Sequence, residues 1–408
     1  MNAFRAIKTY IISKIYPQSY LSPELIALLS VHGIFLLAVG LSNTFISVFL
    51  LKVEKDLSIV VLFNAIYYAT IPIIFIFGGW LAKRLSLTFN LRIGILCYSA
   101  LFIVLLIVQD RAPSYIGLLG VMMGISAGFY YLSYNVLGYD FSTNDNRDYV
   151  MSIQGLVFSI ATMIATFTAG IIIESFKGLK GYIIIFSASL TLFIIAGVLS
   201  SKIPTKAIDK QYYIKSILFM PFKKKNWRYV MLGELLRGFR DGVMLFLMGI
   251  LLYIIVNREA YIGSLTLISS AVQLISFYYI SKKMNPYSRK KYMLIGAIFI
   301  TLVSLVFLYE INIWTIFIYG IISSFYITFI NNSTIGIIYW VIHKTPNSKK
   351  RRIEGIVVRE VYLNVGRVAG VLLLLVFVQD LKSMALFILG LGASQILMWH
   401  LFCKVKLE

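Results

Sequence analysis

The stretch KIPTKAIDKQYYIKSILFMPFKKKNWR, residues 202–228, interrupts a chain that is otherwise almost continuously apolar. It carries eight of the 38 lysines and arginines, and six apolar segments lie on either side of it. A long basic segment in this position is typical of a connector between two helical units. The 408-residue chain is 59% hydrophobic and 13% charged, whereas about a quarter of the residues in soluble domains are charged. The composition therefore excludes a water-soluble protein and indicates one embedded in a lipid bilayer.

The lengths of the apolar segments predict how the chain crosses the bilayer. A spanning helix needs about 20 mostly apolar residues. Backbone groups in lipid must be hydrogen-bonded within their own segment, so these segments are expected to be helices. The sequence thus predicts an all-α membrane protein with twelve transmembrane helices, at 23–51, 58–82, 92–109, 114–139, 150–174, 181–201, 229–256, 261–281, 292–310, 312–342, 357–379 and 384–403.

The basic residues between these segments predict the orientation. Of the 38 lysines and arginines, 28 lie in one alternating set of loops and termini, seven lie in the opposite loops and three lie inside spans. Because positive charge marks the cytoplasmic side, both termini are predicted to be cytoplasmic in a multi-pass protein of the cell inner (plasma) membrane. The net charge of +21 is then mainly a topology signal, and no nucleic-acid partner is expected.

Repeated sequence indicates an internal duplication. Gly124-Ile125-x3-Phe129-Tyr130-x4-Asn135 recurs 196 residues later as Gly320-Ile321-x3-Phe325-Tyr326-x4-Asn331, and Gly40-Leu41-Ser42-Asn43 aligns with Gly238-Phe239-Arg240-Asp241. Arg147-Asp148 is similarly mirrored by Arg359-Glu360. We therefore expect two pseudo-symmetric six-helix bundles. The predicted division is an interfacial segment 1–22, bundles 23–201 and 229–403, a basic linker 202–228 and a tail 404–408.

Twelve spans in two halves, with cytoplasmic termini and a basic central loop, resemble the major facilitator superfamily. The loop after the second span reads Gly79-Trp80-Leu81-Ala82-Lys83-Arg84 and is similar to that family's signature, with Lys83 where the family has Asp. The resemblance implies alternating access, with a central cavity lined by spans one, four, seven and ten.

Charged residues within the seventh span form the densest candidate site. Glu234 and Asp241 are seven residues apart, and Arg237 lies between them at helical spacing, so all three are expected on one face. An ionisable group in lipid costs at least about 2.5 kcal/mol and therefore faces a partner or water. The stripe is either a structural salt-bridge ladder or a site of proton exchange. Asp241, which lies nearer the midplane, is the better candidate for the proton carrier.

Other spans contribute further polar residues. Glu360, Asn364 and Arg367 share one face of the eleventh span, and His32 and Asn43 share one face of the first. A membrane histidine either forms packing hydrogen bonds or carries protons near neutral pH. Tyr130, Asn135, Tyr326 and Asn331, on spans four and ten, serve either as contacts between helices or as ligand contacts.

These residues favour a transporter over an enzyme. The sequence shows no nucleophile–base signature, phosphate-binding loop or metal motif, and no cofactor or metal is expected. Our leading interpretation is a monomeric secondary active transporter that exports a small amphipathic organic compound in exchange for protons. Proton coupling is assigned to Asp241, Glu234, His32 and Glu360, and the substrate cavity to Asn43, Tyr130, Asn135, Arg237, Tyr326, Asn331 and Arg367. The alternatives are a lipid or glycolipid flippase, a nutrient symporter, and a membrane scaffold or sensor that transports nothing.

Overall fold

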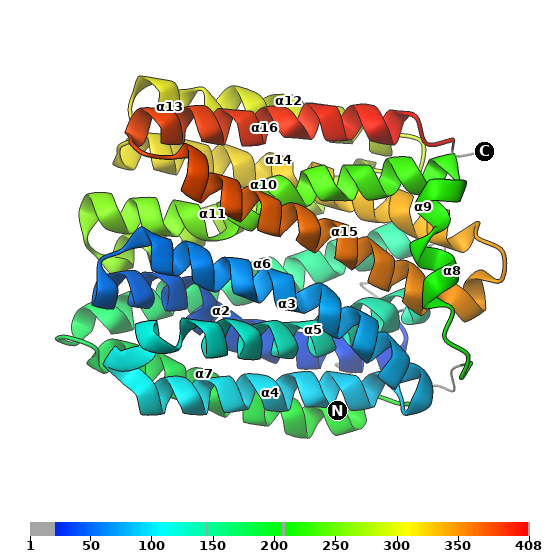
Figure 1. Ribbon diagram of the computed structural model, residues 1–408, viewed down its shortest axis with the longest axis horizontal. Helices are drawn as coiled ribbons and strands as arrows, with labels where there is room; N and C mark the ends of the chain where they lie inside the picture. The colour runs from blue at the N-terminus through cyan, green and yellow to red at the C-terminus, as the bar shows by residue number, and fades with distance from the viewer. Residues whose placement is uncertain (1–20, 143–145, 206–208, 407–408) are drawn as a thin grey trace, which may run out of the picture.

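A computed structural model describes residues 21–142, 146–205 and 209–406 (Figure 1). Within these ranges every regular element is a helix. Nearly all of the predicted interfacial segment 1–22 falls outside the described residues. The helices are α2 Pro23–Glu54, α3 Leu57–Arg84, α4 Leu87–Val108, η1 Gln109–Tyr115, α5 Ile116–Phe141, α6 Arg147–Ser175, α7 Lys180–Leu199, η2 Ser200–Lys202, α8 Ile214–Leu218, α9 Met220–Lys223, α10 Lys225–Val256, α11 Glu259–Lys283, α12 Arg289–Ser304, α13 Val306–Tyr309, α14 Ile313–His343, α15 Ser348–Phe377 and α16 Leu381–Cys403.

The described part of the chain contains eleven helical segments that are long and apolar enough to cross a membrane. One of them, Leu87–Phe141, is 55 residues long, or about 80 Å at 1.5 Å per residue. A bilayer core is only about 30 Å thick. This segment comprises α4, η1 and α5, and α4 packs against α5, so the chain turns back at η1 (Figure 1). The prediction of an all-helical, multi-span membrane protein is confirmed.

Polar side chains fix where several helices begin. Ser22 caps α2 by accepting a hydrogen bond from the Leu25 N–H at 3.2 Å. At the start of α16, Asp380 and Ser383 form a reciprocal capping box. Hydrogen bonds from the Ser383 side chain and backbone hold the pKa of the Asp380 carboxyl below its usual range. Such caps satisfy the backbone N–H groups that a helix leaves free in its first turn.

Two helices extend further than hydropathy predicts. Helix α10 begins at Lys225 rather than 229, and α15 begins at Ser348 rather than 357. Arg359, near the first residue of the predicted span, lies in the interior of α15, and only 7% of it is exposed. The predicted boundary is wrong because a hydropathy window ends at the first charged residues. Both helices continue past these charges: Arg352 and Glu354 are paired within the protein, whereas Lys225, Lys349 and Lys350 are exposed.

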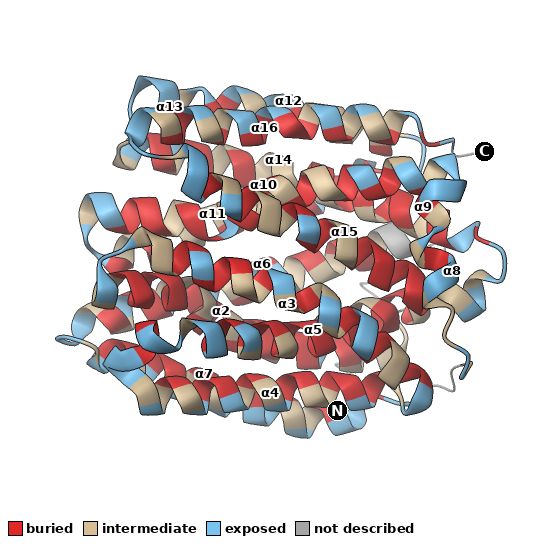
Figure 2. Cartoon of the chain, in the orientation of Figure 1, coloured by how far each residue is buried: buried red, intermediate tan, exposed pale blue. Residues whose placement is uncertain are grey.

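The helices pack in a defined order. In the first part of the chain, α2 contacts α6 and α7, and α5 contacts α3 and α4; in the second, α10 contacts α15 and α16, and α14 contacts α11 and α12. The two parts meet mainly where α6 packs against α11 and α3 against α15. Figure 2 shows buried residues along the facing sides of these helices and exposed residues on the outer faces of the molecule.

Glycines allow α10 and α15 to cross at very short distance. Gly238 and Gly242 on α10 lie against the α15 backbone, and Gly366 and Gly370 on α15 lie against the α10 backbone. A Cβ atom added to Gly366 would overlap the carbonyl oxygen of Leu235, and one added to Gly238 would overlap that of Leu363. Small residues four apart permit this approach between membrane helices. The crossing brings the charged faces of α10 and α15 together.

We expect Gly366→Ala to lower the free energy of unfolding by about 1–3 kcal/mol, because the added methyl group must push two backbones apart. Gly390→Ala on α16 is the matched control, since a Cβ there meets nothing within 4 Å. Thermal unfolding in detergent should show a lower Tm for Gly366→Ala only. Equal Tm values for the two variants would contradict the close crossing.

Candidate functional site

A buried carboxylate on α10 is the centre of the candidate site. Glu234 has no exposed side-chain surface. Its two oxygens accept hydrogen bonds from Nε and Nη2 of Arg237, both at 2.8 Å, and from Nε of Arg359 on α15 at 2.8 Å. One carboxylate therefore faces two guanidinium groups on two helices.

The network continues along α15. Arg359 Nη1 donates to Glu360 Oε1 at 2.6 Å, and Asn364 Nδ2 donates to Glu360 Oε2 at 3.3 Å. Arg367 Nη1 then donates to Asn364 Oδ1 at 3.1 Å. The prediction that Glu360, Asn364 and Arg367 share one face is confirmed. The Arg367 guanidinium also lies 5.3 Å from the ring centre of Tyr68 on α3, a cation–π distance.

Asp241 lies at the other end of the α10 stripe. Its Oδ2 is 3.5 Å from Arg237 Nη1, and its Oδ1 is 3.3 Å from Arg240 Nη1. Arg240 also donates to the hydroxyl of Tyr319 on α14 at 3.2 Å. The predicted carboxylate–guanidinium–carboxylate stripe is thus present. The side chain of Asp241 is 14% exposed, against 0% for Glu234 and 8% for Glu360, which makes it the most accessible of the three acids.

Two asparagines from the repeated motif join this network. Asn331 on α14 accepts a hydrogen bond from Arg237 Nη1 at 3.3 Å. Asn135 on α5 donates to Glu360 Oε1 at 3.5 Å and so connects the two parts of the chain. We call the whole set the charged network: Glu234, Arg237, Arg240, Asp241, Arg359, Glu360, Asn364 and Arg367, with Asn135, Asn331, Tyr68 and Tyr319 as its partners.

The structure places other predicted site residues elsewhere. His32 Nδ1 lies 2.9 Å from the Tyr130 hydroxyl, and the His32 ring stacks on Tyr134 at 3.7 Å, between α2 and α5. The Tyr326 ring stacks on Phe299 of α12 at 4.2 Å. Asn43 is half-buried on α2. None of the four predicted residues His32, Tyr130, Tyr326 and Asn43 shares a described hydrogen bond or ion pair with the charged network.

Arg359 belongs to the charged network and Tyr68 is one of its partners, but neither residue is predicted as a site residue from the sequence. In the sequence, the Arg359-Glu360 pair stands out only as a repeat of Arg147-Asp148. The side chains of Arg147 and Asp148 lie outside the described residues. A signal for Arg359 exists in the sequence, because it precedes Glu360 directly and Glu360 lies in helical register with Asn364. No comparable signal exists for Tyr68, since its role depends on the packing of α3 against α15.

Ion pairs connect the two parts of the chain at the end of the molecule where α8 lies (Figure 1). Lys83 Nζ is 3.3 Å from Glu354 Oε1, and both side chains are almost fully buried. The Tyr213 N–H, just before α8, donates to the same Glu354 oxygen at 2.8 Å. Arg352 pairs with Asp140 nearby. Lys83, predicted to lie in the loop after the second span, is instead the last but one residue of α3 and a buried contact between α3 and α15.

The opposite end of the molecule is also connected by ion pairs. Lys52 at the end of α2 lies 2.6 Å from Glu259 at the start of α11. Arg258, just before α11, pairs with Glu174 at the end of α6. Ion pairs between the two parts are therefore present at both ends, and Asn135 adds a hydrogen bond to Glu360.

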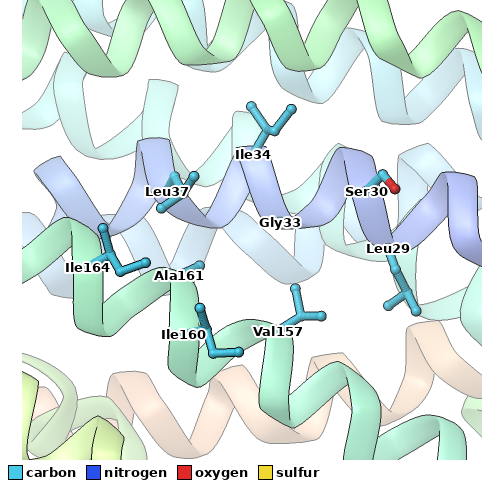
Figure 3. Close-up of a pocket in the computed structure, with 9 residues that line it drawn as sticks. All are labelled: Leu29, Ser30, Gly33, Ile34, Leu37, Val157, Ile160, Ala161 and Ile164. Atoms are coloured by element: carbon cyan, nitrogen blue, oxygen red, sulfur yellow. The ribbon is translucent and has the colours of Figure 1, made fainter. Parts of the chain in front are cut away.

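A groove of about 280 Å³ lies between α2 and α6 (Figure 3). The side chains that line it are almost all apolar, and no member of the charged network is among them. The lining residues are Leu29, Ser30, Gly33, Ile34, Leu37, Val157, Ile160, Ala161 and Ile164. This apolar groove is separate from the predicted polar site.

These features define a helical membrane protein with a buried network of charges shared among several helices. The chain belongs to the Major Facilitator Superfamily, whose model matches residues 28–371. The resemblance noted in the sequence is confirmed, and this family places the chain among membrane transporters and not among enzymes.

Two bacterial proteins are similar in sequence. The uncharacterized protein YqgE of Bacillus subtilis (strain 168) is 31% identical over 373 residues, which is 90% of this chain and 87% of that protein. The uncharacterized protein in the sodM 3′ region of Geobacillus stearothermophilus is 36% identical over 175 residues, which is 43% of this chain and 82% of that protein.

Solved structures of transporters share the fold. A bacterial homologue of the iron transporter ferroportin, in an outward-facing state with soaked iron, superposes with a TM-score of 0.71 at 12% identity, covering 94% of this chain and 99% of that one. The human organic anion transporter MFSD10 superposes with a TM-score of 0.68 at 12% identity, covering 94% and 98%. At such low identity the likeness concerns the fold alone.

Proposed function

We propose that this protein is a secondary active transporter that works by alternating access. In this proposal twelve spans form two six-helix bundles, 23–201 and 229–403, joined by the linker 202–228, with both termini in the cytoplasm. The turn at η1 supports two crossings within Leu87–Phe141, and the excess of basic residues in one set of loops supports the orientation. The two bundles rock about a site near the midplane, and the α8 end faces the cytoplasm.

The observation that carries the proposal is the position of Asp241. It is the most exposed acid of the charged network, and it lies within 3.5 Å of Arg237 and 3.3 Å of Arg240. As a carboxylate it holds both guanidiniums; once protonated it loses its attraction for both. Protonation of Asp241 therefore changes the contacts of α10 with α14 through Arg240 and Arg237. This is the coupling between proton binding and helix position that an exchanger requires.

The other two acids are less suited to carry the proton. Glu234 receives three hydrogen bonds from two guanidiniums, so its protonation would leave Arg237 and Arg359 with only part of their countercharge inside the protein. Glu360 is engaged by Arg359, Asn135 and Asn364. In this proposal Glu234 and Glu360 hold the arginines in place, while His32 contributes to the packing of α2 against α5.

The contacts at the two ends of the molecule supply the gates. For the cytoplasmic side to open, the Lys83–Glu354 and Arg352–Asp140 pairs must separate. For the outer side to open, the Lys52–Glu259 and Arg258–Glu174 pairs must separate. Alternation between these two sets would export a small amphipathic organic compound while protons enter.

Purified protein in proteoliposomes provides the test. Matched aromatic carboxylates, amides and amines would be offered as transport probes while internal pyranine reports proton movement. We expect at least one probe to cross only in protein-containing vesicles, driven by an imposed pH gradient and stopped by a protonophore. A probe flux that is the same with and without the pH gradient would contradict proton coupling. If no probe crosses under any gradient, a membrane scaffold or sensor would be favoured instead.

A further inference from the structure

The charged network contains more guanidiniums than carboxylates. Arg237, Arg240, Arg359 and Arg367 contribute four positive charges, while Glu234, Asp241 and Glu360 contribute three negative charges. The three acids pair with the first three arginines. Within the described part of the chain, Arg367 has no carboxylate partner closer than 4.0 Å. It is the arginine that carries the excess charge.

The contacts of Arg367 are weak substitutes for an anion. Its Nη1 donates to the neutral oxygen of Asn364 at 3.1 Å, and its guanidinium lies over the Tyr68 ring at 5.3 Å. Its Nε is buried and has no hydrogen-bond partner. A buried donor without a partner destabilises the protein, and more so when the group is charged. An anion bound at Arg367 would satisfy this donor and neutralise the charge.

The backbone around Arg367 fixes the position of this group. A Cβ atom added to Gly242 on α10 would lie 2.6 Å from the Arg367 Cα, so α15 is in close contact with α10 at this residue. Tyr68, the aromatic partner, belongs to α3, which packs against α15 from the other part of the chain. Arg367 therefore lies where the two parts of the chain meet, as expected for a substrate contact in a rocking mechanism.

We propose that Arg367 binds the carboxylate or phosphate of the transported compound, with the Tyr68 ring beside it. The substrate class is then an amphipathic organic anion. This inference rests on the proposed transport function and specifies its substrate. A guanidinium binds carboxylate or phosphate through two parallel hydrogen bonds, for which the free Nε supplies one donor. The aromatic ring can contact the apolar body of the ligand.

The test uses full-length protein in nanodiscs of phosphatidylcholine, with ligand-induced thermal stabilisation as the readout. The probes share one skeleton: 4-phenylbutyrate, 4-phenylbutyl phosphate, 4-phenylbutanamide and 4-phenylbutylamine. We expect the two anions to stabilise the wild type and the amide and amine to have no effect. Arg367→Gln should weaken the anions at least tenfold, or about 1.4 kcal/mol. Arg84→Gln, at an exposed arginine near Trp80, is the matched control and should bind like the wild type.

Arg367→Lys is a second variant in case the glutamine variant misfolds, because lysine keeps the positive charge. Lysine cannot form the two parallel hydrogen bonds of a guanidinium. We expect Arg367→Lys to bind the anions with intermediate affinity. Added phosphatidylglycerol distinguishes a lipid head group from a free anion, and a response to this lipid that requires Arg367 would support the same anion site. Any of three results would overturn the inference. The amide or amine could stabilise the protein as much as the anions, Arg367→Gln could bind the anions with unchanged affinity, or no anion could have an effect.

The test also separates this inference from the proposed proton coupling. Anion binding is measured without a gradient, and we expect it to persist in Asp241→Asn. If Asp241→Asn retains coupled flux while Arg367→Gln loses anion binding, the proton assignment fails and the anion site stands. If coupled flux depends on Asp241 but the transported probe is a cation, the anion site fails and the exchanger stands.

Discussion

Replacing Glu234 by alanine is expected to lower the stability of this protein by about 3–5 kcal/mol, the usual cost of breaking a buried ion pair from one side. The carboxylate is completely buried and receives bonds from Arg237 and Arg359. Its removal leaves both guanidiniums with reduced compensation inside the bundle. Because these arginines connect α10 to α15, the close crossing of the two helices is expected to loosen as well.

The measurement is equilibrium or thermal unfolding of purified protein in detergent. Glu54→Ala at the exposed end of α2 is the matched control and should unfold like the wild type. Glu234→Gln should fall between the wild type and Glu234→Ala, because the amide oxygen still accepts a hydrogen bond. If Glu234→Ala unfolds at the wild-type temperature, the network does not hold α10 against α15.

Asp241→Asn is expected to reduce pH-gradient-driven flux to the background of protein-free vesicles while leaving the fold intact. Asparagine matches the shape of aspartate and keeps one oxygen acceptor, but it cannot take up and release a proton. Because Asp241 is partly exposed and its two arginines are also held by Glu234 and Tyr319, the substitution should leave the network in place. The effect should therefore appear in coupling and not in stability.

Two assays on the same vesicles make this prediction specific. Exchange of labelled for unlabelled probe needs no net proton movement and should survive in Asp241→Asn. Asp110→Asn, at an exposed residue of η1, should match the wild type in both assays. Gradient-driven flux that persists in Asp241→Asn would show that another group carries the proton. Loss of exchange together with flux would instead assign Asp241 to substrate binding.

Much of the site follows from helical spacing in the sequence. Residues three, four and seven apart share a helix face, which predicts the contacts of Arg237 with Glu234 and Asp241 and of Asn364 with Glu360. The structure confirms both sets of contacts. Such spacing is informative here because an unpaired charge is costly in a membrane, so charges on one face nearly always pair.

Other parts of the site depend on information that spacing does not contain. Hydropathy treats a charged residue directly after an apolar run as part of a loop, whereas Lys83 is paired inside the protein. Tyr326 is the counterpart of Tyr130 in the repeated motif, and both are predicted to line the substrate cavity. In the structure the Tyr326 ring stacks on Phe299. Which neighbour an aromatic ring selects depends on the packing of helices far apart in the sequence.

The glycine spacing of α10 and α15 is a further signal that the sequence contains. Gly238 and Gly242 are four apart, as are Gly366 and Gly370. A pair of such motifs favours a close helix crossing. Because charged faces lie beside both motifs, the same spacing indicates that α10 and α15 are neighbours and that their charges meet.

Double electron–electron resonance between spin labels at the two ends of the molecule tests the central claim of alternating access most directly. One pair would join Leu85 to Lys404 at the α8 end, and the other Arg111 to Tyr309 at the opposite end, with Cys97 and Cys403 replaced by serine. We predict that lowering the pH or adding a bound probe lengthens one distance and shortens the other. Distances that stay fixed, or that lengthen together, under every condition would contradict the transporter account.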